Sequence, residues 1–216
     1  MVIFHFCFDL NNFHIFNFDL QHGLFWRYYR YVIVTMFVFA SGISLKLTHK
    51  EFIKFDKVKK RVIILGISSL IVSVGSYTQF PDSWIYFGIL HFFLFASIFG
   101  LFFLKIPKIS LILAIFILVG YNYNFLNMHW CYNLLQKPLH LPINYTEDLA
   151  NIVPWFGVFL LGIVFANYKL HDKVFNYKIF NPKKLICRFF SFIGKHSLLI
   201  YLIHQPILFG AFLLLK

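Results

Sequence analysis

The chain has 216 residues, of which 60% are apolar, 22% are aromatic and only 13% are charged. A soluble domain carries about 25% charged residues, whereas the mean hydropathy of this chain is +0.73. The composition excludes a soluble globular domain and indicates an integral membrane protein. The formal net charge of +12 lies mainly in the connections between apolar runs, so it does not indicate a nucleic-acid partner.

Apolar runs of about 17–25 residues predict membrane-spanning helices. The chain begins with a shorter run, MVIFHFCFDL, which is about half a span and lacks the basic segment and cleavage site of a signal peptide. The sequence predicts an all-α integral membrane protein, a bundle of about seven transmembrane helices with the first one incomplete, in a single domain over residues 1–216. Six complete spans are expected, at about residues 28–46, 62–78, 84–104, 108–126, 152–168 and 196–215.

The basic residues indicate which side each connection occupies. Sixteen of the 20 Lys and Arg residues fall in three alternate connections, at residues 46–61, 105–108 and 169–195. Cytoplasmic connections carry such an excess of basic residues, so these three are expected inside and the C-terminus outside, in a bacterial plasma membrane. The basic connections either contact anionic lipid or also attract an anionic cytoplasmic substrate.

Four polar residues share one face of the last predicted span: Ser197, Tyr201, His204 and Gln205. Their spacing of i, i+4, i+7 and i+8 places them together on a helix. Pro206 lacks an N–H group and bends the helix beside them. This face is expected to point at the bundle interior or a wet cavity, because it cannot face lipid.

Two more histidines, His5 and His91, lie within predicted spans, in the outer half of the membrane. Ionisable groups inside a span are costly and are candidates for function. Each histidine on its own is explained by an interhelical hydrogen bond. Together with His204 they indicate a site where imidazole takes a proton or attacks as a nucleophile. A metal site is the competing interpretation, but no pattern of Asp or Glu ligands accompanies these histidines, so no metal is expected.

Five stretches occur in the order found in one known family. They are FHFCFDL (4–10), FVFASGISL (37–45), FGILHFF (87–93), PWFGVFLLGIVFA (154–166) and IGKHSLLIYLIHQPIL (193–208). Over nearly its whole length the chain resembles the heparan-α-glucosaminide N-acetyltransferase catalytic-domain family, a group of multi-span membrane acyltransferases related to the acyltransferase-3 group.

The resemblance implies transfer of an acetyl or similar acyl group from cytoplasmic acyl-CoA to a sugar or amino-sugar acceptor on the outer face. The implied partners are acetyl-CoA as donor and a glycan or amino sugar as acceptor. Membrane lipid is expected from the composition, and a homo-oligomer is a separate expectation. His5 matches the family's histidine and is expected to be the general base or a transient acyl carrier, with His22 as its rival for that role.

Other residues are expected to support the reaction. His204, Tyr201 and Gln205 would line the acceptor side, supported by His91. Arg30, at an outer helix entry, would bind a carboxylate or phosphate. Asp9 and Asp148 match acidic positions of the family, and either orient a histidine or the acceptor or simply cap helices at the interface.

The chain departs from the family at its start. Family members usually carry an Arg-Gly pair whose arginine lies eleven residues before the histidine that matches His5, whereas Met1 comes only four residues before it. The sequence is therefore expected to be N-terminally truncated or to have lost this motif. Two alternatives to an acyltransferase stay open, a transporter of a small solute or acyl compound and a catalytically inactive fragment.

Overall fold

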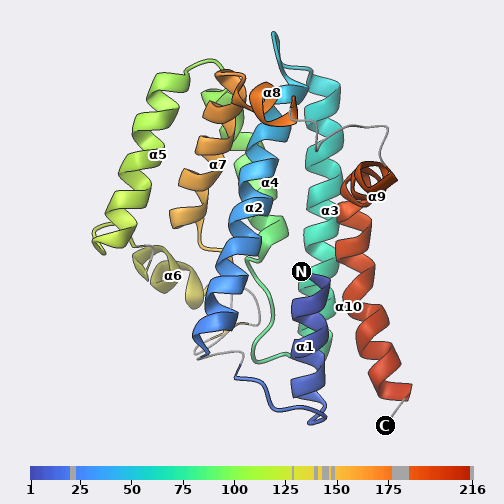
Figure 1. Cartoon of the computed structure of the whole chain (residues 1–216). Coiled ribbons are helices and arrows are strands. Elements are labelled where there is room, and N and C mark those ends of the chain that lie inside the picture. Colours follow the sequence, from blue (N-terminus) through green and yellow to red (C-terminus); the bar gives the residue numbers. More distant parts are fainter. Residues whose placement is uncertain are drawn as a thin grey trace. The chain divides into compact units, whose positions relative to one another are not determined.

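The computed structural model describes residues 1–19, 23–127, 129–138, 141, 142, 146, 149–176 and 185–214. Regular structure within these residues is entirely helical, which confirms the all-α prediction (Figure 1). The elements in chain order are α1 (Val2–Asn12), α2 (Leu24–Thr48), α3 (Phe55–Gln79), α4 (Ile89–Phe99), the 3-10 helix η1 (Gly100–Phe103), α5 (Pro107–Asn122), α6 (His129–Gln136), α7 (Ile152–Asn167), α8 (Leu170–Phe175), α9 (Leu185–Lys195) and α10 (Ser197–Leu214).

Three of these helices are long and apolar enough to cross a membrane: α2, α3 and α10. The apolar helices Ile89–Phe103, α5 and α7 are shorter. At 1.5 Å per residue, a 16-residue helix such as α5 is about 24 Å long, whereas the hydrocarbon core is about 30 Å thick. Membrane association is therefore supported by three helices, and a bundle of seven spans stays a prediction.

Large apolar side chains cover the outside of the long helices instead of being buried. Met36 on α2, Leu70 and Val74 on α3, and Ile207 on α10 are each more than 60% exposed. A soluble protein seldom exposes contiguous apolar surface on this scale. The exposed apolar surface is what lipid contact requires.

The connections between the apolar runs contain additional helices. Residues 127–151 include α6, and residues 169–195 include α8 and α9. Both segments lie between expected spans, and no helix was predicted in either of them. They are short, at 8, 6 and 11 residues, and polar residues interrupt their apolar character.

The chain divides into two compact units. Unit 1 comprises Met1–Val34 and Asp172–Lys216, and unit 2 comprises Thr35–His171. The expectation of a single domain over the whole chain stays a prediction.

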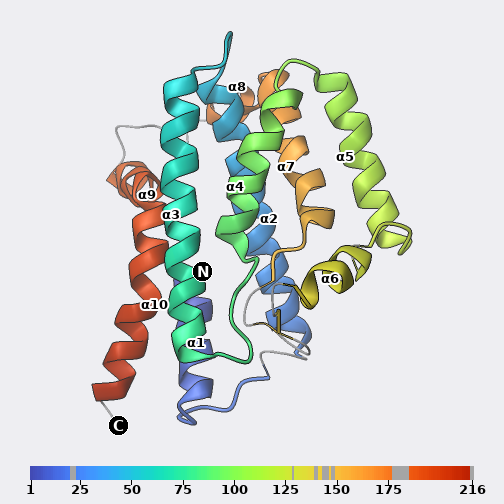
Figure 2. The ribbon, with the colours of Figure 1, turned by 180° about the vertical axis from the view of Figure 1, so that it is seen from behind.

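In unit 2, α5 and α7 run side by side and α3 lies against α4 (Figure 2). The backbones of α2 and α7 also approach closely at two glycines. A Cβ atom on Gly42 would overlap the carbonyl oxygen of Phe159, and one on Gly162 would overlap that of Phe39. These two positions therefore require glycine for the close packing of α2 on α7. Gly66 on α3 differs, because a Cβ atom there would meet no atom within 4 Å.

In unit 1, α1 packs along α10. The ring of Phe13, directly after α1, lies 5.3 Å from that of Phe209 and 5.4 Å from that of Phe212. Near the start of α1, Phe4 contacts Trp26 of α2, with ring centroids 6.0 Å apart. Aromatic contacts therefore hold α1 at both ends.

The close approach of α2 and α7 predicts opposite results for alanine at two helical glycines. Gly42→Ala should lower the thermal unfolding midpoint in detergent, because the added methyl group overlaps backbone and overpacking costs about 1–3 kcal/mol. Gly66→Ala is the matched control. It should leave the midpoint unchanged or raise it, because alanine favours the helix by up to about 1 kcal/mol over glycine. Equal effects of the two substitutions would contradict the packing described.

Candidate active site

Helices α1 and α10 bring together four polar side chains from opposite ends of the chain. His5 and Asp9 are four residues apart on α1, hence on one face, and His204 and Gln205 are neighbours on α10. The ring centroids of His5 and His204 lie 4.9 Å apart. The Gln205 side chain donates a hydrogen bond from Nε2 to Asp9 Oδ1, at 2.9 Å. We refer to these four residues as the α1–α10 cluster.

The backbone of α10 determines which tautomer His204 adopts. Its Nδ1 lies 2.7 Å from the carbonyl oxygen of Tyr201 and 3.1 Å from that of Ile200. A carbonyl oxygen only accepts hydrogen bonds, so Nδ1 carries a proton. Nε2 is buried and has no hydrogen-bond partner among the described residues. Nε2 is thus the ring nitrogen that a bound molecule can contact.

Two further atoms of the cluster are buried without a partner among the described residues. They are Asp9 Oδ2 and Gln205 Oε1, and the Asp9 side chain has no exposed surface at all. An unsatisfied buried polar atom costs about 1–3 kcal/mol, and such atoms are rare in folded proteins. The Gln205 oxygen accepts hydrogen bonds, and Asp9 Oδ2 and His204 Nε2 can accept them, so the arrangement is complementary to a molecule that offers N–H or O–H groups.

Tyr201 lies next to the cluster. Its ring centroid is 5.7 Å from that of His204, and its side chain is half-buried. The polar face predicted for α10 therefore packs on α1 at its His204 end, whereas Ile203 and Ile207 on the remaining faces are exposed.

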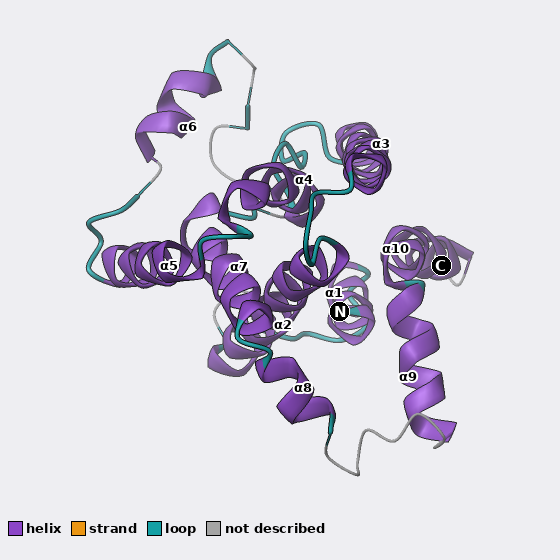
Figure 3. Cartoon of the chain, turned by 90° about the horizontal axis from the view of Figure 1, so that it is seen from above, coloured by secondary structure: helices purple, strands orange, loops and turns teal. Residues whose placement is uncertain are grey.

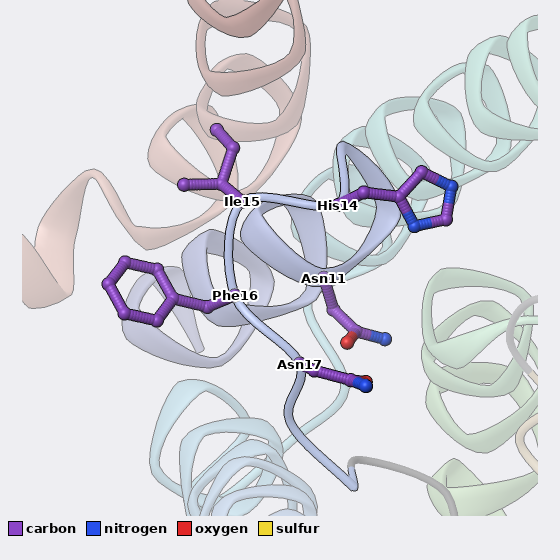
Figure 4. Close-up of a pocket in the computed structure, with 5 residues that line it drawn as sticks. All are labelled: Asn11, His14, Ile15, Phe16 and Asn17. Atoms are coloured by element: carbon purple, nitrogen blue, oxygen red, sulfur yellow. The ribbon is translucent and has the colours of Figure 1, made fainter.

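A small pocket opens where α1 ends (Figure 4). It has a volume of about 370 Å³ and is lined by Asn11, His14, Ile15, Phe16 and Asn17. The amide groups of Asn11 and Asn17 extend toward the same side, and the apolar side chains of Ile15 and Phe16 extend away from it. Amides donate and accept hydrogen bonds, as sugar hydroxyls do. The pocket follows Asp9 by about half a helical turn, and the sequence analysis did not identify it.

His91 has partners for both ring nitrogens. The backbone N–H of Gly88 donates to its Nδ1 at 3.2 Å, and its Nε2 lies 3.1 Å from the Ser73 hydroxyl. Since Ser73 donates its own proton to the carbonyl oxygen of Ile85 at 2.7 Å, Nε2 is the donor to Ser73. His91 thus joins α3 to the start of α4 in unit 2, which is the interhelical role open to any histidine inside a span. A supporting role in acceptor binding stays a prediction.

The remaining predicted site residues are Arg30, His22 and Asp148. Arg30 is on α2, in unit 1, and its side chain is exposed. His22 and Asp148 lie outside the described residues. Their expected roles stay predictions, as does the absence of a metal. Within the described ranges, no three His, Cys, Asp or Glu side chains form a group that could hold an ion.

Arg61 is a functional candidate that the sequence analysis missed. It was counted only among the basic residues of the connection 46–61. Its Nε donates to the Ser97 hydroxyl and one terminal nitrogen donates to the Ser41 hydroxyl, each at 2.8 Å. Arg61 therefore links α2, α3 and α4 through neutral hydroxyl partners. The available sequence signal was its position directly before the apolar run 62–78.

The chain belongs to the heparan-α-glucosaminide N-acetyltransferase catalytic family. The sequence profile of that family, described as "Heparan-alpha-glucosaminide N-acetyltransferase, catalytic", matches residues 1–206, which confirms the resemblance seen in the five stretches. No curated protein and no solved structure matches the chain. Membership supports a membrane acetyltransferase in general terms, and acetyl-CoA is the donor expected for the family.

The hydrogen bonding of Asp9 predicts how its substitution affects stability. Asp9→Asn should retain or raise the unfolding midpoint, because the amide oxygen can still accept from Gln205 and the NH2 group replaces an unpartnered oxygen. Asp9→Leu should lower the midpoint, because Gln205 then loses its partner at a cost of about 1–3 kcal/mol. Thermal unfolding in detergent measures both. If Asp9→Asn destabilised as much as Asp9→Leu, the negative charge itself would be required by the fold.

His49, directly after α2, predicts a pH dependence of stability. Burial lowers its pKa below the usual 6.5, and the nearby charges of Arg61, Lys57 and Lys54 lower it further. Its Nδ1 accepts a hydrogen bond from the backbone N–H of Lys54 at 3.1 Å, which agrees with a neutral ring.

As pH falls below 6.5, His49 therefore becomes protonated in the unfolded chain but stays neutral in the folded chain. The free energy of unfolding decreases until the pH passes the lower pKa of His49 in the folded chain. The unfolding midpoint should decrease over this window in the wild type. His49→Asn keeps an acceptor for the Lys54 N–H but has no titratable side chain at this position. The unfolding midpoint of this variant should therefore decrease less over the same pH window. Identical pH profiles would show that His49 is not responsible.

Proposed function

We propose that this protein is a membrane acyltransferase that moves an acetyl or similar acyl group from cytoplasmic acyl-CoA to a sugar or amino sugar on the outer face. The observation that carries the proposal is the α1–α10 cluster. A histidine with a buried nitrogen that has no partner among the described residues lies beside a second histidine and two unpartnered side-chain oxygens, in a chain of an acetyltransferase family.

In the direct route, the acceptor oxygen or nitrogen attacks the carbonyl carbon of the thioester. A bond forms between this atom and the acyl carbon, the carbon–sulfur bond breaks, and CoA leaves as the thiolate. The acceptor's proton passes to a histidine of the cluster, which supplies general-base catalysis. His5 and His204 both lie where they can take this proton. His204 Nε2 is the ring nitrogen of the cluster that is buried without a partner among the described residues.

A two-step route uses His5 as a transient acyl carrier. The His5 ring would attack the thioester first, forming a nitrogen–acyl bond as CoA leaves, and the acceptor would then break that bond. His204 would receive the acceptor's proton in the second step. The two routes differ in whether the acyl group remains on the protein when no acceptor is present.

Asp9 and Gln205 would position the acceptor. Their vacant oxygens, Asp9 Oδ2 and Gln205 Oε1, accept hydrogen bonds from hydroxyl or amino groups, which sugars and amino sugars carry in number. Holding the acceptor beside the base supplies the orientation that an already activated thioester requires.

The basic connections support an anionic donor. Phosphate groups of acyl-CoA would be attracted to the connections expected inside, and Arg61 is the residue there whose hydrogen-bond partners are neutral hydroxyls. The proposal keeps the C-terminus outside, in a bacterial plasma membrane, in agreement with the distribution of Lys and Arg. It also allows assembly as a homo-oligomer.

The test is acyl transfer by the full natural chain in proteoliposomes, with radiolabelled acetyl-CoA and a panel of amino sugars and glycans. His204→Ala and His5→Ala should each lower transfer by at least about 100-fold, because a positioned general base contributes about 10²–10⁴-fold. His196→Ala is the matched control, because His196 is exposed at the start of α10, away from the cluster. It should keep full activity.

The same assay distinguishes the direct route from the carrier route, and it can also contradict the acyltransferase proposal. Label that stays on the protein without acceptor, and is absent from His5→Ala, indicates the carrier route. Absence of such label together with acceptor-dependent transfer indicates the direct route. If the folded protein transferred no label and bound no acetyl-CoA across the panel, the acyltransferase proposal would be wrong.

A further inference from the structure

Helix α9 exposes a broad apolar surface. None of its residues is buried, and the exposed apolar side chains are Leu185, Ile186, Phe189, Phe190 and Phe192, each at least 58% exposed. Four of them line an open pocket of about 650 Å³: Leu185, Ile186, Phe189 and Phe192. At 100° per residue these five side chains fall within one side of the helix. We call this surface the apolar face of α9.

The opposite side of α9 is polar and positively charged. Arg188 and Lys195 are seven residues apart, which places them on one face, and both are exposed. Ser191 lies between them on the same side. The helix sequence, LICRFFSFIGK, contains no Asp or Glu. A strongly apolar face opposed by a basic one is the pattern of helices that lie in a membrane interface.

The orientation of α9 fits a helix that lies in the membrane interface. In Figure 3, α9 is seen from the side and α10 along its axis, whereas in Figure 1 α10 is seen from the side and α9 along its axis. The two helices are therefore close to perpendicular. His196 joins them directly, since its N–H donates to the carbonyl oxygen of Phe192 and its own carbonyl accepts from Ile200. α10 is long and apolar enough to cross a membrane. With 11 residues, α9 is about 16 Å long and too short to cross about 30 Å of hydrocarbon.

We propose that α9 lies in the plane of the inner leaflet, with its apolar face among the acyl chains and with Arg188 and Lys195 at anionic lipid headgroups. The helix that begins at Ser197 then enters the membrane from this surface. The partner is the anionic lipid leaflet, and the inference does not depend on the acyl-transfer chemistry.

Two observations favour lipid over a protein partner. The connection 169–195, which contains α9, has seven Lys and Arg residues, as inner connections have in membrane proteins, and anionic lipids occur in the cytoplasmic leaflet. In addition, α9 leads directly into an apolar helix of membrane-crossing length, so its apolar face lies at the level where the acyl chains begin.

Spin-label accessibility of the full natural chain tests the position of α9. Cys7, Cys131 and Cys187 are replaced by Ala, and a single nitroxide is placed at Phe192→Cys on the apolar face or at Ser191→Cys on the polar face. In nanodiscs that contain phosphatidylglycerol, the label at 192 should collide more with oxygen than with a water-soluble nickel chelate. The label at 191 should show the reverse.

The role of the positive charges is tested in the same background. Removing phosphatidylglycerol should shift the label at 192 toward the water-soluble reagent. The double substitution Arg188→Glu and Lys195→Glu should cause the same shift with phosphatidylglycerol present. The charge-conserving pair Arg188→Lys and Lys195→Arg is the matched control and should cause none. The comparison of nanodiscs with and without phosphatidylglycerol keeps Arg188 and Lys195 in place. It therefore still tests the proposal if the charge-reversed variant does not fold.

Three results would overturn the proposal. Equal accessibility at positions 191 and 192 would exclude an interfacial orientation. A label at 192 that is shielded from both reagents would show that the apolar face is covered by protein, such as a second copy of the chain. If the accessibility of the label at 192 changed neither on removal of phosphatidylglycerol nor on charge reversal, anionic headgroups would be excluded as the partner.

Discussion

The hydrogen bond between Gln205 and Asp9 is the contact on which the arrangement of the candidate site depends. The Asp9 side chain has no exposed surface, so its carboxyl group must find partners within the protein. It is bound by Gln205, which lies 196 residues further along the chain. Because of this contact, His5 faces His204 on the same side of α1. In a membrane, where no water competes for these groups, such a bond also keeps two helices associated.

The contacts along α1 and α10 show that the two helices run in the same direction. His5 lies beside His204, Asp9 beside Gln205, and Phe13 beside Phe209 and Phe212. The start of α10, where α9 joins it, is therefore at the same end as the start of α1. The pocket that follows α1 is at the other end, on the side that the positive charges predict to be outside.

Hydropathy predicted most of the helices, because a helix that contacts lipid must be apolar over a long run. The runs 28–46, 62–78 and 196–215 correspond to α2, α3 and α10. Helix α9 was not predicted, because basic and small polar residues divide its apolar residues into pieces too short for a span. The sequence pattern that indicates α9 is the separation of apolar and basic residues onto opposite helical faces. This pattern is detected from a periodicity of 3.6 residues, and not from the length of an apolar run.

The site was predicted only in part, for a different reason. The spacing of Tyr201, His204 and Gln205 shows from sequence that they share one face of α10, since this depends on local geometry alone. That Asp9 is the partner of Gln205 cannot be read from spacing, because helix pairing over such a separation is set by tertiary packing. The same holds for Arg61, whose hydroxyl partners Ser41 and Ser97 come from two other helices.

Helix geometry separates the pocket after α1 from the α1–α10 cluster. Asn11 lies about 3 Å beyond Asp9 along the helix axis, at a rise of 1.5 Å per residue. Residues two positions apart do not share a helix face, so the Asn11 side chain is on a different face of α1 from His5 and Asp9. The Asn11 amide oxygen accepts a hydrogen bond from the backbone N–H of Phe18 at 3.0 Å, which fixes the segment after α1 to the helix. The face of α1 that packs on α10 therefore carries the buried polar atoms, and the face that carries Asn11 shapes the turn that follows.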